Sequence, residues 1–576
     1  MWATHPPPFM TQLKKLKAAK DIYDISTLLN YKAGKLSYIL YVIDESDKYS
    51  SFEIPKKGGG TRTIKSPIPK LKRLQKNLSN LLQNCLDELR SENSYVDPMS
   101  HGFEKKRNII TNAEVHRAKR YIFNIDIKDF FGSINFGRVR GFFIKDNRFE
   151  LDPKIATIIA QICCHENSLP QGSPCSPVIS NIIGHILDVR LLSLAIKNGC
   201  SYTRYADDIT FSTNKKKFPS SIAAKDDEGH GWSVGKELSD ILKTNKFSEN
   251  KNKTRMQYKT SRQSVTGLVV NKKINVRSEY RKQVRAMVHS LFSKGTFFIP
   301  KAGVAPMDEF PEGTLNQLHG MLGFIDSIDQ NNVLRQGLEA ASITQKEKTY
   351  RKFLLYKDFY LSTRPIILCE GKTDNIYLKC AIKSLAGQHQ LLGERVGVDS
   401  FKMKVRFYKY AETSTGRILG LSGGTGDFPK FINSYLSGIS KFTALELNHP
   451  VIMIIDNDSG AKGIYSKLRE ILNRQISPAE EYIYAGENLY IVPTPIAKHG
   501  QHSMIEDCFD KDTKKILVDG KKFNPDDKAS IDMFYGKSVF ATQVIERFSE
   551  KINFNGFSVF LSRIESAINH FHNMKG

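Results

Sequence analysis

Polar and apolar positions alternate with a period of two around one pair of acids in the middle of the chain. Residues 202–212 interleave aromatic or apolar side chains with small polar ones, and Asp207 and Asp208 interrupt this pattern. The alternation predicts a tight β-hairpin with the two acids at its tip. Residues 121–125 form an apolar, strand-like run that ends at a third acid, Asp126. An isolated Asp-Asp turn is usually just solvated, so the interpretation depends on what surrounds the pair.

Helical spacing is clearest in two other stretches. Residues 70–89 place apolar side chains three or four positions apart with basic residues between them, which predicts a packed helix. Residues 278–294 show the same spacing, with Ser278 as an N-cap candidate and Gly295 after the end. Residues 1–50 are predicted to form helices broken at Gly34.

Residues 49–67 read as strand, glycine turn, strand, which predicts a β-hairpin. This hairpin carries several cations, including Arg62 and Lys65. These cations could bind a ligand, or the hairpin could simply be a basic, solvent-exposed one.

The pattern of apolar and polar positions changes at residue 364. Buried-type strands then alternate with helical runs, which predicts a parallel α/β sheet with ligands at the carboxyl ends of its strands. One strand ends at Glu370 and another at Asp456-x-Asp458. A glycine-rich loop at 421–427 and the acids of residues 504–507 are weaker candidates for the same site.

The net charge of +25 is unevenly distributed. Residues 365–576 hold 27 Lys and Arg against 24 Asp and Glu, whereas residues 1–364 hold 58 against 36. The basic excess therefore surrounds the Asp-Asp hairpin, as expected where basic side chains hold nucleic-acid phosphates and carboxylates hold a metal. A generally basic surface for solubility would not predict this asymmetry.

Neither a membrane span nor a signal peptide is expected from the apolar runs. The 8 cysteines form no CxxC, so neither a zinc knuckle nor a disulfide framework is indicated, and a cytoplasmic location is expected.

Three strings occur in the order expected of a polymerase palm: the strand ending at Asp126, a Pro-Gln-Gly loop at 170–172, and Tyr-Ala-Asp-Asp at 205–208. Together they resemble the palm of a reverse transcriptase. The resemblance implies an α+β right-hand polymerase of fingers, palm and thumb. It also implies two-metal catalysis with Mg²⁺ at Asp126, Asp207 and Asp208, and it places Ile127 in the same metal site.

The same resemblance suggests roles for other residues. Arg62 and Lys65 would grip the incoming deoxynucleoside triphosphate, and Lys253 would neutralise or protonate the leaving pyrophosphate. Phe131 would lie under the sugar and exclude a ribose, although it could also be an ordinary core aromatic. The remaining positions are Gln171 and Gly172, facing nucleotide and template, and Arg281, Lys282 and Arg285, contacting RNA from the thumb.

Two further strings, Asn112-Ala-x-x-His116 and Val265-Thr-Gly267, resemble signatures of retron reverse transcriptases. His116 could equally be a structural histidine and is given no catalytic role. Retron enzymes copy their own structured noncoding RNA from a guanosine 2′-OH primer into branched, multicopy single-stranded DNA (msDNA). The implied partners are that RNA, its msDNA and dNTPs, and a homo-oligomer is left open.

Glu370 with Asp456 and Asp458 resembles a Toprim domain, a Rossmann-like α/β fold that binds Mg²⁺ or Mn²⁺. The implied organisation is N-terminal helices (1–50), fingers and palm (51–260), thumb (261–330), connector (331–364) and Toprim domain with a C-terminal extension (365–576). In anti-phage retrons a fused domain is commonly the toxic effector, so a nuclease restrained by the RNA–DNA product is expected. An intron-type or diversity-generating enzyme, or a nucleic-acid-bound assembly with a silent Toprim site, remains an alternative.

Overall fold

The computed structural model describes residues 11–56, 60–92, 99–225, 231–300, 310–336, 344–397, 400–442, 446–496, 502–526, 530 and 532–575. The chain forms two compact units. The first comprises Met1–Arg281 and Ser327–Leu338, and the second Lys282–Asp326 and Glu339–Gly576. The finer domain division expected from the sequence stays a prediction.

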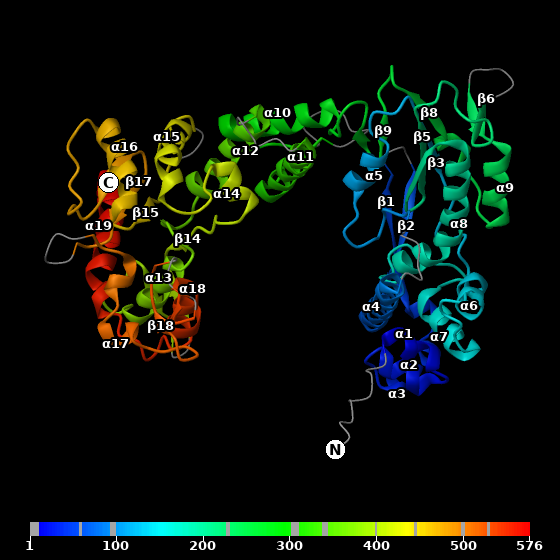
Figure 1. Cartoon of the computed structure of the whole chain (residues 1–576), viewed down its shortest axis with the longest axis horizontal. Coiled ribbons are helices and arrows are strands. Elements are labelled where there is room, and N and C mark those ends of the chain that lie inside the picture. The colour runs from blue at the N-terminus through cyan, green and yellow to red at the C-terminus, as the bar shows by residue number, and fades with distance from the viewer. Residues whose placement is uncertain are drawn as a thin grey trace. The chain divides into compact units, whose positions relative to one another are not determined.

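The first unit is mainly helical around a four-stranded central sheet, with three two-stranded sheets besides it among the described residues (Figure 1). Its helices are α1 (Gln12–Ala18), α2 (Ile22–Leu28), α3 (Ala33–Ser37), α4 (Pro69–Ser91), α5 (Ile109–Val115), α6 (Phe136–Lys145), α7 (Pro153–Cys163), α8 (Ser176–Asn198) and α9 (Lys236–Thr244). Its strands are β1 (Tyr49–Pro55), β2 (Thr61–Pro67), β3 (Tyr121–Asp126), β4 (Ser201–Tyr205), β5 (Asp208–Thr213), β6 (Ala223–Lys225), β7 (Trp232–Val234), β8 (Arg255–Tyr258), β9 (Ser264–Val265) and β10 (Leu268–Val269).

The central sheet has the antiparallel order β4-β5-β3-β8. The predicted hairpin is confirmed, because β4 and β5 pair with Tyr205 opposite Asp208. In the β3–β5 pairing, Asp126 stands opposite Asp208. The basic hairpin is confirmed as well, because β1 and β2 pair from Tyr49 opposite Pro67 to Pro55 opposite Thr61. The glycines at 58 and 59 lie outside the described residues.

The core of this unit runs through α1, α4, α7, α8 and the central sheet. The helix predicted at 70–89 is α4, and every apolar position that defined its stripe is buried. Helix α8 is long and apolar enough to cross a membrane by composition alone, but 67% of its most apolar window is buried inside the protein. It is thus a core helix, and it packs along β4.

Gly34 does not break a helix, contrary to the expectation from the sequence. It lies inside α3, and the breaks fall at Ala19, the C-cap of α1, and at Leu29, the C-cap of α2. Two other helices contribute residues to both units: α10 (Ser278–Lys294) and α11 (Leu315–Gln336). The predicted bounds of α10 are confirmed, and Gly295 after it has a φ of 75°.

The second unit contains the predicted alternation of strands and helices (Figure 1). Its helices are α12 (Gln345–Leu354), α13 (Asp374–Ser384), α14 (Ser414–Leu419), α15 (Phe428–Ile439), α16 (Lys462–Leu472), α17 (Lys511–Lys514), α18 (Lys537–Val539) and α19 (Ser558–Lys575). Its strands are β11 (Ile366–Cys369), β12 (Gly393–Arg395), β13 (Phe401–Met403), β14 (Arg406–Phe407), β15 (Val451–Ile455), β16 (Ile483–Gly486), β17 (Leu489–Pro493), β18 (Lys522–Phe523) and β19 (Phe534–Tyr535).

The main sheet of this unit has the order β14-β11-β15-β17-β16. The pairs from β14 to β17 are parallel and only β16 is antiparallel, so the predicted parallel α/β sheet is confirmed. Strands β11, β15 and β17 are buried at every residue, as expected of parallel strands covered on both faces. Because β11 and β15 are parallel neighbours, the acids that follow them share one edge.

Candidate active site

Three carboxylates meet at one end of the central sheet of the first unit. Register brings Asp126 opposite Asp208, and the N–H of Ile127 donates to the carbonyl of Asp207 at 2.9 Å. Burial, together with the neighbouring Asp126 carboxylate, raises the pKa of Asp207. The Asp208 side chain reaches solvent, yet loss of water around it and repulsion by Asp207 and Asp126 raise its pKa to about 6.

The third acid is held by a loop that follows α9. Asp126 is only 6% exposed and accepts from Lys253 Nζ at 2.7 Å and from Asn250 Nδ2 at 3.1 Å. The Asn250 N–H also donates to the Asp126 carbonyl at 2.7 Å. The hydrogen bond to Asp126 raises the pKa of Lys253. Lys253 is therefore built into the carboxylate cluster. Asn250, which the sequence reasoning noted only as part of the same string and gave no role, also binds there.

These residues fit a divalent cation by their chemistry. Burial, with added repulsion among the three carboxylates, raises the pKa of Asp207 and of Asp208, and carboxylate oxygens are hard ligands of the kind Mg²⁺ takes. Within the described ranges, no group of three Asp, Glu, His or Cys side chains is arranged to hold a metal as the side chains stand. In this site one carboxylate oxygen of Asp126 accepts from Lys253 and the other accepts from Asn250.

Strand β2 and the Pro-Gln-Gly loop are joined. The N–H of Lys65 donates to the carbonyl of Gln171 at 2.8 Å, and the Lys65 side chain forms an ion pair with Glu166. Gly172 has a φ of 125°, and a Cβ there would stand 2.5 Å from the Lys65 carbonyl oxygen. Lys65 thus reaches Glu166, whereas the charge of Arg62 acts on Asp207 and lowers its pKa against the larger effect of burial.

The other residues considered in the sequence analysis lie either among the packed side chains of the first unit or on the exposed surface of α10. Phe131 is half-buried against Phe130 and Phe103, with ring centroids 5.5 and 6.2 Å away. His116 is fully buried between Ser212 Oγ and Thr203 Oγ1, at 2.7 Å from each. Burial lowers the pKa of His116 to about 3, so it is a neutral link between strands. The α10 cations Arg281, Lys282 and Arg285 are all exposed.

A second acidic site lies at the carboxyl edge of the parallel sheet. Burial and the nearby Asp374 and Asp458 raise the pKa of Glu370 to about 7, and its Oε2 is buried without a hydrogen-bond partner. Burial and the neighbouring carboxylates Asp374, Glu506 and Glu370 raise the pKa of Asp456 to about 8. An orphaned carboxylate oxygen among acids that repel one another fits a cation.

Three other side chains complete this second site. Asp374 is the first residue of α13 and accepts from the Gly371 N–H at 2.8 Å. Glu506 is 1% exposed and lies 3.2 Å from Lys537 Nζ, and the N–H of the preceding Ile505 donates to Asp456 Oδ1 at 2.8 Å. The sequence offered a signal for Asp374, four residues after Glu370 on the next helix, and a weak one for Glu506. It offered none for Lys537.

The remaining acids of this edge have local partners. Asp458 accepts from the Gly460 N–H at 2.7 Å. A Cβ on Gly460 would stand 2.7 Å from Thr425 Oγ1, so the glycine-rich loop reaches the turn after Asp458. Asp507 instead caps the Met504 N–H at 3.0 Å.

Comparison with known proteins bears on the first unit. The family described as "Reverse transcriptase (RNA-dependent DNA polymerase)" matches residues 54–276. Retron Ec86 reverse transcriptase of Escherichia coli is 31% identical over 345 residues, which span 59% of this chain and 94% of that protein. Retron Mx162 reverse transcriptase of Myxococcus xanthus is 32% identical over 329 residues, 53% of this chain and 63% of that protein.

Among solved structures, telomerase from Candida albicans with a TWJ fragment of telomeric RNA aligns over 69% of this chain and 64% of that chain. Its TM-score of 0.32 and identity of 12% are too low to support any argument. The sequence relatives alone show the family to which this chain belongs. The matched segment contains all three palm carboxylates, and a retron enzyme is covered almost end to end. The chain therefore belongs to the retron reverse transcriptases, which are RNA-directed DNA polymerases.

Proposed function

We propose that this chain copies its own structured noncoding RNA, primed from a guanosine 2′-OH, into branched msDNA, and that its C-terminal part is a Toprim nuclease acting as a toxic effector in anti-phage defence. The observation that carries the proposal is the presence of two separate carboxylate clusters, one in each compact unit. The proposed setting is cytoplasmic, with dNTPs, the cognate RNA and msDNA as partners.

Each polymerase residue has a defined task in this proposal. Asp126, Asp207 and Asp208 would hold Mg²⁺, which supplies activation of the primer hydroxyl and charge neutralisation at the leaving group. Lys253, already bonded to Asp126, brings an ammonium group for the pyrophosphate. Arg62 adds a guanidinium for the triphosphate. The exposed cations of α10 contact RNA phosphates without reading sequence.

The polymerase assignment is tested by Asp207→Ala. This change should abolish primer extension while leaving RNA affinity nearly intact, because the carboxylate serves chemistry and the basic residues serve binding. Asp240→Ala, which removes an exposed acid of α9, is the matched control and should retain full activity. A polymerising Asp207→Ala protein would rule out the assignment.

The product assignment is tested on nucleic acid that copurifies with the protein from a host carrying the native flanking sequence. A discrete DNA that shortens with RNase and is joined to one RNA through a 2′–5′ branch is the expected result. Heterogeneous RNA without DNA would favour the intron-type or diversity-generating alternative.

The proposed effector activity uses the second acidic site. Glu370, Asp456 and Asp458 would hold Mg²⁺ or Mn²⁺ for cleavage of a phosphodiester, with the RNA–DNA product restraining the activity until infection disturbs it. The unpartnered oxygen of Glu370 supports a metal role for that residue.

Glu370→Ala should remove both toxicity and phage protection, since a metal ligand would be lost. Glu412→Ala, which removes an exposed acid paired with Lys372, should retain both effects. A Glu370→Ala protein that remained as toxic and protective as the parent would favour the alternative of a silent Toprim site.

A further inference from the structure

The turn that carries the catalytic aspartates has a strained backbone. Ala206, immediately before Asp207, has a φ of 57°, in the left-handed region that non-glycine residues rarely occupy. Such a conformation costs on the order of 1 kcal/mol and persists only where the surroundings hold it. The carbonyl of Ala206 accepts a hydrogen bond from Arg204 Nη1 at 3.0 Å, so the residue that holds the turn is two positions earlier in the same hairpin.

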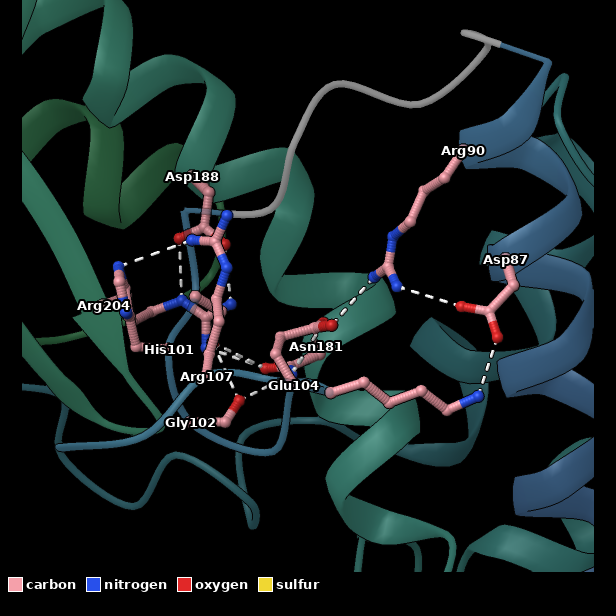
Figure 2. Close-up of polar contacts among 11 residues, drawn as sticks. Asp87, Arg90, His101, Gly102, Glu104, Arg107, Asn181, Asp188 and Arg204 are labelled. Carbon is pink, nitrogen blue, oxygen red and sulfur yellow. Dashed lines mark hydrogen bonds and ion pairs between the residues drawn. The ribbon is translucent and has the colours of Figure 1, made fainter. Parts of the chain in front are cut away.

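Arg204 is itself fixed by a buried carboxylate. Its Nε and Nη2 donate to the two oxygens of Asp188 on α8, each at 2.7 Å, and both residues are at most 1% exposed (Figure 2). Asp188 also accepts from the Tyr202 hydroxyl at 2.6 Å. The guanidinium lies 5.6 Å from the centroid of the Phe130 ring. A bidentate pair of this kind fixes direction as well as distance.

The main chain of Arg204 is also held by hydrogen bonds on both of its polar groups. Its N–H donates to the Met99 carbonyl at 3.1 Å, and its carbonyl accepts from His101 at 2.7 Å. The backbone of the next residue, Gly102, lies against the turn so closely that a Cβ there would stand 2.6 Å from the Ala206 nitrogen. Asn181 Nδ2 on α8 donates to the Gly102 carbonyl at 2.8 Å (Figure 2). Helix α8 therefore contacts both sides of the turn.

Stability does not explain why a charged pair stands here. Removing two ions from water is costly, and well-packed apolar side chains in place of a buried pair are often equally stable. What apolar side chains cannot supply is a directed hydrogen bond to the Ala206 carbonyl.

We propose that Asp188 and Arg204 are positioning residues for DNA synthesis: the pair transmits the position of α8 to the Ala206 carbonyl and thereby sets where the Asp207 and Asp208 carboxylates stand relative to Asp126. Neither residue touches the substrate. Their effect is on the geometry of the catalytic acids, where a displacement of about 1 Å can cost about 100-fold in rate.

The first test is Arg204→Lys, which keeps the charge but cannot span both Asp188 oxygens and the Ala206 carbonyl. The expected result is a fall in kcat of about 10- to 100-fold, with KM for dNTP and affinity for RNA within about 2-fold. Hydrogen exchange of a peptide covering residues 205–209 should accelerate without a matching change in global unfolding. Arg190→Lys, on the exposed side of α8, is the matched control and should change none of these quantities.

The second test replaces the three polar side chains by apolar ones, as Asp188→Leu with Tyr202→Phe and Arg204→Met, so that no buried charge is left without its counter-ion while the Ala206 carbonyl loses its donor. We expect this variant to fold with a Tm close to that of the parent and to be slow in DNA synthesis, with fast exchange in the turn. A folded variant with parental kcat and parental exchange would overturn the proposal. Failure of both variants to fold would overturn it too, because the pair would then be a requirement of the fold.

Discussion

At the scale of single residues, the proposed polymerase site is defined by the hydrogen bonds of Asp126. Its two carboxylate oxygens are bonded to Lys253 and Asn250, both of which lie more than 120 positions later in the chain. An ammonium at 2.7 Å stabilises the charged carboxylate and is itself kept protonated, since the same bond raises the pKa of Lys253. Lys253 is thus a cation at the site throughout the neutral pH range.

Lys253→Met tests its role in catalysis. We expect kcat for nucleotide addition to fall by about 100-fold, because no ammonium group would neutralise or protonate the leaving pyrophosphate. This size is within the range for loss of a proton donor at a leaving group. Single-turnover primer extension measures this. Lys251→Met, in the same short helical turn and also exposed, should stay close to the parent. Equal rates for the two variants would remove Lys253 from the mechanism.

The buried histidine His116 predicts a pH dependence of stability. Its pKa is lowered by burial to about 3, whereas an unfolded histidine titrates near 6.5. Below pH 6.5 the unfolded state therefore binds a proton that the folded state does not, and stability falls as the pH drops from about 6.5 towards 3. The contribution is about 2 kcal/mol between pH 6.5 and pH 5.

Urea unfolding at pH 7.5 and pH 5 measures this effect. His101 and His185, whose pKa values burial lowers to about 4, add losses of the same sign. His116→Asn should therefore show a pH dependence shallower by about one proton than that of the parent. An unchanged slope would show that His116 is protonated in the folded protein.

At the scale of elements, strand β2 depends on the Pro-Gln-Gly loop for its position. The two are joined by the Lys65–Gln171 backbone bond and by the close approach of Gly172 to the Lys65 carbonyl. Because Arg62 lies on the same strand, any displacement of β2 also displaces the cation proposed to hold the triphosphate.

Gly172→Ala should raise KM for dNTP several-fold and destabilise the unit by about 1–3 kcal/mol, because a Cβ would collide with backbone at a φ of 125°. Gly34→Ala is the control. A Cβ at Gly34 meets nothing within 4 Å and the residue is helical, so this change should be neutral or slightly stabilising. Steady-state kinetics and thermal unfolding compare the two. A parental KM in Gly172→Ala would show that the loop tolerates the shift.

At the scale of the whole molecule, each acidic site is built from residues of a single compact unit. The charges that shift the pKa values of Asp207 and Asp208 come from the first unit, and those that shift Glu370 and Asp456 come from the second. Each site therefore has its own electrostatic balance.

We accordingly expect Asp208→Ala to abolish DNA synthesis and Glu370→Ala to leave the rate of DNA synthesis within about 2-fold of the parent, as expected for sites that share no residues. Primer extension on the same RNA measures both. A large loss of synthesis in Glu370→Ala would reveal coupling between the units that the charges do not indicate.

The amino-acid sequence by itself determined the elements that carry the acids. The β4–β5 hairpin and the stripe of α4 follow periods of two and of three to four residues. The strands ending at Asp126, Glu370 and Asp456 are marked instead by short apolar runs. Short-range sterics and burial on one face produce such periods, so they can be read locally.

Only the tertiary structure decided which side chains meet at those acids. Lys65 reaches Glu166, Lys253 reaches Asp126, and Arg204 reaches Asp188. Glu506 and Lys537 join the second site. Local periodicity carries no information on these pairings, because they join elements whose separation in the chain bears no fixed relation to distance in the fold. They are set by how α8, the sheets and the loops pack, which is where the catalytic geometry is determined.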